Sequence, residues 1–217
     1  LVENENTAKF KISVNMMDMT FSIIAIPPVP EYYMVGRQNG WSLSTATAMY
    51  PTSKGTASYT SYFTGAWDCR IADMEQINGG IWDNYGAAEE SGTCTQLAEK
   101  TGKCIMSPEA GYYTLSVDFD KMTYSWKKID VTASYGKISL IGANNDWNTD
   151  LDFTQIKGSD DLGDNTTHNW ALKGVEITAD CGVKVRADHD WATSWGMTPT
   201  TAGDFIYGTG TTKDGPN

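Results

Sequence analysis

The chain has 217 residues, of which 40% are apolar and 20% charged, and its formal net charge at pH 7 is −11. A chain of this length can bury one large or two ordinary cores, and no stretch approaches the roughly 20 apolar residues that a membrane span needs. The acidic balance argues against a nucleic-acid partner, because phosphate binding needs a basic face. A neutral, hydroxyl-rich ligand would be indifferent to that charge.

Strand patterns dominate the chain from its start. Residues 10–16 (FKISVNM) alternate apolar and polar side chains with the period of two of a half-buried strand, and residues 113–119 (YTLSVDF) do the same. Helical periodicity is nearly absent, apart from a short turn expected at residues 87–91 or 95–100. Strands separated by Gly, Asn and Asp clusters predict an all-β sandwich fold.

An internal repeat organises the chain. Residues 8–26 align without gaps with residues 111–129, an offset of 111 − 8 = 103. The segment VGRQNGW (35–41) aligns with IGANNDW (141–147), an offset of 141 − 35 = 106.

The repeat predicts three domains. Residues 1–30 are the C-terminal strands of a preceding module, residues 31–130 a complete module, and residues 131–217 a second module that lacks its last strands. A sandwich without those strands would expose sheet edge and core. We therefore expect the natural protein to continue on both sides. The alternative is that residues 8–26 supply the missing hairpin to residues 131–217, within one chain or by swapping.

Four cysteines bear on the compartment. Cys94 and Cys104 bracket a loop and are either a disulfide or free thiols, depending on the compartment. Cys69 and Cys181 sit in strand-like runs, so we expect buried free thiols there. The chain has no C-x-x-C pair, which makes a zinc or redox site improbable.

The first repeated motif is Val or Ile, then Gly, a polar stretch and Trp. Gly36 and Gly142 predict a bend with positive φ. Trp41 and Trp147 close the motif, and either cap one end of the sandwich or face a ligand.

The second repeated motif is an aromatic pair in a glycine-flanked loop. Trp82 and Tyr85 are three residues apart, and Trp191 and Trp195 are four apart. Alternation along a strand would place residues three apart on opposite faces, so strand packing explains the pairs poorly. Two rings along a loop form a platform on which sugar rings stack. In this interpretation one aromatic residue of each pair can be buried. The alternative is that both residues of each pair pack in the core.

Polar partners stand near these rings. Alternation within residues 183–187 predicts that the apolar side chains point inward and that Lys184 and Arg186 point outward near Trp191. A cation with several donors beside an aromatic plane can hold vicinal hydroxyls of a sugar. Arg70 is the nearest counterpart in the first module. The alternative is that these are solvated surface charges.

No catalytic or metal motif stands out. Asp160, Asp161 and Asp164 offer carboxylates to calcium, but their spacing matches no EF-hand loop. A solvated loop is the simpler interpretation, and we expect no cofactor. Two histidines are too few for a metal site, and no HExxH, GxSxG or P-loop pattern occurs. The sequence therefore predicts a protein that is not an enzyme.

Four segments together resemble a known family: YYMVGRQNGW (32–41), AGYYTLSVDFDKMTYSW (110–126), ISLIGANNDW (138–147) and VKVRADHDWATSWG (183–196). They are similar to the SusE/SusF-like surface glycan-binding lipoproteins of Bacteroidetes, over nearly the whole chain. The resemblance implies tandem immunoglobulin-like β-sandwich modules, anchored by a lipid to the outer membrane and facing outward. It also implies starch-like α-glucan as the ligand. The implied protein partners are a porin-type transporter and companion glycan-binding lipoproteins.

The resemblance carries site residues over by position. In the second module these are Trp191, Trp195, Lys184 and Trp147. In the first module they are Trp82, Tyr85, Trp41 and Arg70. Two departures, a longer approach to Trp82 and an inserted loop between Cys94 and Cys104, predict an altered first site. The expected function is non-catalytic polysaccharide binding at the cell surface. The alternatives are a structural or adhesin-like spacer, or the binding region of a glycoside hydrolase.

Overall fold

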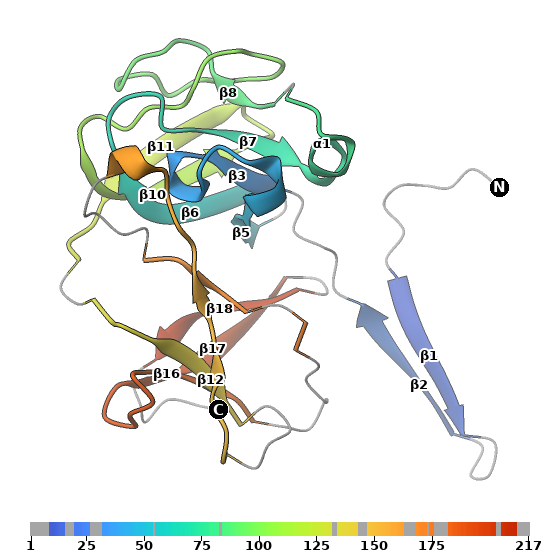
Figure 1. Cartoon of the computed structure of the whole chain (residues 1–217). Helices are drawn as coiled ribbons and strands as arrows, with labels where there is room; N and C mark the ends of the chain where they lie inside the picture. Colours follow the sequence, from blue (N-terminus) through green and yellow to red (C-terminus); the bar gives the residue numbers. More distant parts are fainter. Residues whose placement is uncertain are drawn as a thin grey trace.

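The computed structural model describes residues 9–15, 20–26, 32–53, 55–82, 84–131, 134–142, 147–162, 168–172, 174–175, 182–202 and 205–211. Its regular structure is almost entirely β, as predicted, and one short α-helix occurs in the described part (Figure 1). Within those residues, no helix is long and apolar enough to cross a membrane.

Two hairpins confirm the repeat at the level of single residues. Strands β1 (Lys9–Asn15) and β2 (Thr20–Ile26) pair with Ser13 opposite Ser22. Strands β10 (Gly111–Asp118) and β11 (Thr123–Lys128) pair with Ser116 opposite Ser125. Both pairings differ by the offset of 103 residues found in the sequence. Among the described strands, β1 and β2 pair only with each other.

The predicted first module, residues 31–130, contains two facing sheets in its described part. One sheet has the order β11-β10-β6-β5 and the other β4-β3-β7. The strands not yet introduced are β3 (Tyr32–Gly36), β4 (Thr47–Ala48), β5 (Tyr50–Ser53), β6 (Thr56–Phe63) and β7 (Cys69–Asp73). Side chains of β6 and β10 alternate between buried and more exposed positions, so Tyr59 and Leu115, opposite one another, both enter the core. They meet Met34 and Ile71 from the other sheet.

A short helix, α1 (Met74–Gly79), follows β7 and was not predicted. The Asp73 side chain accepts a hydrogen bond from the backbone N–H of Gln76 at 2.8 Å, and the Gln76 side chain accepts one from Asp73 N–H at 3.1 Å. This is a capping box, and it was the sequence signal for the helix. No helix forms at residues 87–91 or 95–100, where a short turn was expected: the strands β8 (Gly86–Ala87) and β9 (Leu97–Ala98) pair there. A turn lies between them, in which Cys94 N–H donates to the Ser91 carbonyl at 3.0 Å.

The described part of the predicted second module, residues 131–217, contains a five-stranded sheet of order β13-β12-β16-β17-β18 and a two-stranded ribbon, β14-β15. The sheet consists of β12 (Ile138–Ile141), β13 (Leu151–Asp152), β16 (Lys184–Ala187), β17 (Ser194–Ala202) and β18 (Phe205–Thr211). The ribbon consists of β14 (Thr154–Gln155) and β15 (Trp170–Ala171). The described residues also form three short 3-10 turns: η1 (Arg37–Asn39) and η2 (Leu43–Thr45) in the first module, and η3 (Asp160–Leu162) in the second.

The two motif glycines have in common that a neighbouring backbone segment lies very close to them, and not that both form a bend. Gly142 has the predicted positive φ of 98°, but Gly36 has an extended φ of −178°, so that prediction was wrong. A Cβ on Gly36 would lie 2.3 Å from the Asp68 carbonyl oxygen, and one on Gly142 would lie 2.3 Å from the Gly182 carbonyl oxygen. At both positions the neighbouring strand leaves no room for a side chain.

The described cysteines are free thiols. Cys69 is fully buried, as predicted, and burial raises the pKa of its thiol. Cys94 and Cys104 are both partly buried and not joined to each other. Cys181 lies outside the described residues.

The loop between β14 and β15 reaches across to the first module (Figure 1). The Asn169 amide donates to the Tyr59 hydroxyl and to the Thr60 carbonyl, both at 3.2 Å. His168 Nε2 lies 3.2 Å from the Tyr112 hydroxyl. These contacts place the second module against the β6–β10 face of the first.

The same loop holds the candidate calcium residues. Asp161 forms an ion pair with Arg37 of the first module. Asp164 lies outside the described residues. Within the described part, no three His, Cys, Asp or Glu side chains group as a metal site would.

Candidate functional site

Two exposed tryptophans meet on the second module. Trp191 is 44% exposed and Trp147 is 36% exposed, and their ring centroids are 5.9 Å apart at an angle of 41°. Trp191 stands in the turn between β16 and β17, where the Asp190 carboxylate accepts a hydrogen bond from Ala192 N–H at 2.8 Å. Trp147 has a left-handed backbone with φ of 64°. The pair presents two tilted aromatic faces to solvent.

Arg186 supports this pair from β16. Its guanidinium carbon lies 4.6 Å from the centroid of the Trp191 ring, within the range of a cation–π interaction. The same guanidinium donates to both carboxylate oxygens of Asp150, with Nε to Oδ1 at 2.8 Å and Nη2 to Oδ2 at 2.5 Å. Asp150 also accepts a hydrogen bond from the Ser139 hydroxyl at 2.6 Å. The cation is therefore fixed in place before any ligand arrives.

The ion pair also governs protonation at the site. Hydrogen bonds from the Arg186 guanidinium hold the pKa of Asp150 at about 2, and the pKa of Arg186 is raised by the same contact. Asp150 therefore stays ionised at any pH above about 4, well above its own pKa. Beside it, His189 Nε2 contacts an oxygen of the Asp152 carboxylate at 2.5 Å.

The sequence prediction for the two cations was wrong about their exposure. Lys184 and Arg186 are each only 9% exposed instead of pointing into solvent. The reason is that β16 lies in the middle of the five-stranded sheet, and Asp150 and Trp191 cover the Arg186 side chain. Asp150 itself was missed. It stands 36 residues before Arg186, and no local pattern marks it.

The predicted pair of Trp191 and Trp195 is separated. Trp195 lies within β17, opposite Val185, and is not in a loop. Its half-buried ring packs edge-on against Tyr135, with centroids 5.4 Å apart. Trp191 instead meets Trp147, so the two exposed rings come from different loops.

In the first module, Tyr85 has the same backbone pairing as Trp195 has in the second. Tyr85 pairs with Ile71 of β7, as Trp195 pairs with Val185 of β16. The Tyr85 ring packs edge-on against Tyr32 and Phe119, at centroid distances of 6.0 and 5.3 Å. Burial raises the pKa of its hydroxyl. In both modules, then, the second aromatic residue of the motif packs against other rings.

Trp82 is the exposed member of the first pair, at 44%. Trp41 has a left-handed backbone with φ of 58°, matching Trp147, and is half-buried. Among the described residues no ring contact joins Trp41 to Trp82. The double platform of the second module is therefore not reproduced here.

Arg70 occupies the position of Lys184. Each is the strand partner of the residue before the motif glycine, Val35 in one module and Ile141 in the other. The Arg70 guanidinium donates to the Trp82 carbonyl at 3.4 Å and to the Thr101 carbonyl. A carbonyl of the inserted loop thus accepts a hydrogen bond from the guanidinium that was predicted to bind a ligand.

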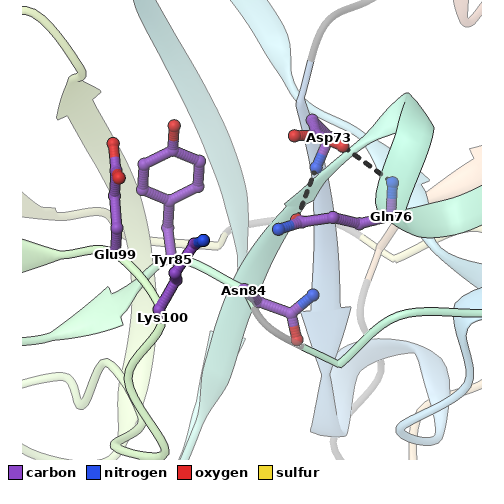
Figure 2. A pocket seen from close by; sticks show the side chains of 6 residues that line it. All are labelled: Asp73, Gln76, Asn84, Tyr85, Glu99 and Lys100. Carbon is purple, nitrogen blue, oxygen red and sulfur yellow. Dashed lines mark hydrogen bonds between the residues drawn. The ribbon is translucent and has the colours of Figure 1, made fainter.

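The first module has a polar pocket in this region, of about 140 Å³ (Figure 2). Its lining consists of Asp73, Gln76, Asn84, Tyr85, Glu99 and Lys100. Asn84 is fully buried, and its side-chain oxygen has no hydrogen-bond partner. The pocket forms because α1 and the inserted loop, both departures from the repeat, meet at the end of β7.

These features define a class of protein: a β-sandwich that exposes aromatic rings beside fixed polar groups, as carbohydrate-binding modules do. Residues 28–128 match the family model described as SusF, first starch specific CBM, where CBM denotes a carbohydrate-binding module. The predicted resemblance is confirmed over the first module: residues 28–128 are similar to the starch-specific carbohydrate-binding module of SusF-like proteins.

A solved structure is also similar to the chain. The crystal structure of SusF from Bacteroides thetaiotaomicron shares 15% identity at a TM-score of 0.40, covering 88% of this chain and 48% of that one. The chain therefore spans about half the length of that protein. A comparison with curated proteins finds no significant match.

Proposed function

We propose that this chain binds polysaccharide without cleaving it, and that its ligand is a starch-like α-glucan. The observation that carries the proposal is the pair of exposed indole rings of Trp147 and Trp191 with Arg186 fixed beside them. The family match covers the first module, residues 28–128, and its description as starch specific supports the choice of glycan.

Stacking is the main source of affinity in this proposal. The faces of a sugar ring carry apolar C–H groups, and an indole face is the largest complementary surface that a side chain offers. The angle of 41° between the two rings suits a chain that curves, because successive sugar rings can each lie on one indole. A helically curved α-glucan has such a shape.

Hydrogen bonds supply orientation. Arg186 has donors left over after its two bonds to Asp150, and its guanidinium carbon lies 4.6 Å from the centroid of the Trp191 ring. We propose that these donors bind vicinal sugar hydroxyls. Lys184, two residues earlier on β16, is the second proposed contact, and Trp195 supports the strand beneath the platform through its packing on Tyr135.

The first module is proposed to bind more weakly. Trp82 offers one exposed ring, while Arg70 is engaged with backbone carbonyls and Tyr85 is packed inward. Trp41 completes the proposed set at the loop after β3. Two unequal sites on one polymer still raise avidity, because the second contact forms at high effective concentration.

We further propose that the whole protein acts at the cell surface, lipid-anchored to the outer membrane. In that setting it would hold glycan for a porin-type transporter and work beside companion glycan-binding lipoproteins. These roles rest on the family resemblance.

Native affinity electrophoresis tests the proposal. The wild type is run through gels containing amylopectin, pullulan, dextran or xylan, beside Trp147→Ala/Trp191→Ala. Tyr50→Ala is the matched control, since Tyr50 is 60% exposed on the first module. We expect retardation by amylopectin and pullulan that is lost in the double variant and kept in the control, with unchanged melting temperatures. Free migration of the wild type on every gel would instead favour the spacer interpretation.

A further inference from the structure

Trp67 has the highest exposed fraction of the tryptophans that the structure describes. Its side chain is 58% exposed, and its backbone is left-handed with φ of 45°. It stands in the loop of residues 64–68 that joins β6 to β7. A bulky side chain rarely adopts this backbone conformation, and it persists only where the surroundings impose it.

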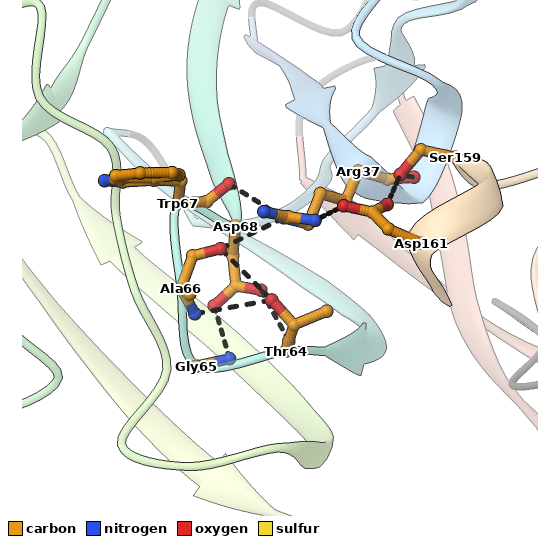
Figure 3. A network of polar contacts seen from close by, with 8 residues as sticks. All are labelled: Arg37, Thr64, Gly65, Ala66, Trp67, Asp68, Ser159 and Asp161. Atoms are coloured by element: carbon orange, nitrogen blue, oxygen red, sulfur yellow. Dashed lines mark hydrogen bonds and ion pairs between the residues drawn. The ribbon is translucent and has the colours of Figure 1, made fainter. Parts of the chain in front are cut away.

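A buried carboxylate imposes it here (Figure 3). Asp68 is fully buried and accepts hydrogen bonds from Thr64 N–H at 2.5 Å, from the Thr64 hydroxyl at 2.9 Å and from Gly65 N–H at 3.1 Å. It also accepts from Ser107 N–H at 2.9 Å and the Ser107 hydroxyl at 3.2 Å. One side chain thus fixes the loop on both sides and ties it to the neighbouring segment.

Arg37 holds the middle of the loop and connects it to the second module. Its Nε donates to the Ala66 carbonyl at 3.0 Å and lies 3.4 Å from the Trp67 carbonyl. The same guanidinium forms an ion pair with Asp161, and the Arg37 carbonyl accepts from Ser159 N–H at 2.6 Å (Figure 3). The backbone of Trp67 is therefore tied to the second module through Arg37, while its ring points away from Arg37 (Figure 3).

Trp147 combines the same two features. It too has a left-handed backbone, with φ of 64°, and an exposed ring, at 36%. In both cases a left-handed backbone carries an indole that stays exposed in the fold. The fixed loop of Trp67 suits a ligand contact, because little loop freedom is lost on binding.

The surroundings of Trp67 favour a sugar over a protein. The neighbours in its loop are Thr64, Gly65, Ala66 and Asp68, and none is a large apolar residue. The other large apolar side chains that are exposed in the described part lie outside this loop. A protein partner needs a cluster of anchors around its central residue, whereas a single sugar ring needs one aromatic face.

We propose that Trp67 is a further glycan-stacking residue, which takes a ring of the same polymer that occupies the second-module platform. This proposal rests on the proposed function. Because Arg37 sets the position of Trp67 relative to the second module, a long chain can contact both places and a short oligosaccharide can contact only one. The contribution of Trp67 then grows with the length of the ligand.

The test compares Trp67→Ala with the wild type on amylopectin and on maltotriose. We expect affinity for amylopectin to fall about threefold or more, as the loss of one contact among several implies. We expect maltotriose binding at Trp147 and Trp191, followed by calorimetry, to be unchanged. Tyr50→Ala is the control for loss of an exposed aromatic residue, and Trp67→Phe should restore most of the polymer affinity.

The outcomes separate the two proposals. If Trp67→Ala keeps wild-type affinity for amylopectin while Trp147→Ala/Trp191→Ala loses it, the inference about Trp67 is wrong and the proposed function stands. If the wild type binds no glucan, both fail. An unchanged melting temperature in Trp67→Ala confirms that a lowered affinity reflects binding and not folding.

Discussion

The two modules share their strand pairing and differ in the aromatic rings that they expose. Arg70 and Lys184 have equivalent strand partners, and so do Tyr85 and Trp195. Yet the second module exposes two rings in contact with each other, and the first exposes Trp82 without a ring partner in the described part. Between the two repeats, the packing of equivalent residues is kept, but the arrangement of exposed rings at the candidate site is not.

One pair of residues accounts for much of the difference. Arg186 is the strand partner of Ser139, and Ala72 is the partner of the equivalent Tyr33. Asp150 stands just before β13, and Ala46 just before β4. The ion pair of the second module is thus replaced by two alanines in the first, and among the described residues no cation lies over the face of Trp82.

The expected difference in glucan binding between the two modules is tested most directly by removing one exposed tryptophan from each. Trp191→Ala should lower affinity for amylopectin at least tenfold, about 1.4 kcal/mol, because it removes a stacking face and the partner of Arg186. Trp82→Ala should lower it by less than about threefold. Calorimetric titration measures both. Equal losses would show that the modules bind alike, against the difference drawn from their structures.

A second prediction separates the two members of one motif by stability. Tyr85→Ala should cost about 2 kcal/mol of unfolding free energy, because the ring packs against Tyr32 and Phe119. Trp82→Ala, at an exposed position, should cost less than about 0.5 kcal/mol. Urea denaturation followed by circular dichroism gives both values. A large cost for Trp82 and a small one for Tyr85 would reverse the assignment of exposed and packed roles.

A third prediction concerns the ion pair. Asp150→Ala should lower stability by about 1–2 kcal/mol, since it leaves a mostly buried guanidinium with fewer acceptors. It should also weaken glucan binding severalfold, because Arg186 is no longer held beside Trp191. Asp118→Ala is the control: Asp118 pairs with Lys121, whose side chain is 77% exposed, and its loss should change neither quantity appreciably.

The smallest expected effect is that of pH. The pKa of Asp150 is lowered from 3.8 to about 2 by Arg186, so the pair's stabilisation is complete above the ordinary value and is lost as pH falls through about 2. The difference in melting temperature between the wild type and Asp150→Ala should therefore be constant from pH 8 to about 4 and shrink below it. A difference that fades between pH 7 and 5 would point to another titrating group.

Much of the fold could be read from local patterns, and less of the site. Period-two alternation predicted the strands around Ser13 and Ser116, and the offset of 103 between their hairpins was confirmed in the register. The α1 helix was missed because six residues are too few for a helical period. Its capping box, Asp73 with Gln76, was present in the sequence but outweighed by the strand signals around it.

The sequence by itself determined the β-rich fold, the repeat and the family resemblance, because each depends on patterns among residues near one another in the chain. Only the tertiary structure decided that Trp191 meets Trp147 and not Trp195, and that Arg186 is covered and not free in solvent. The physical reason is that these contacts arise where separate loops and strands converge. Strand register and the burial of side chains on a central strand determine which side chains meet there. Both depend on residues that are far apart in the sequence, so no local pattern predicts them.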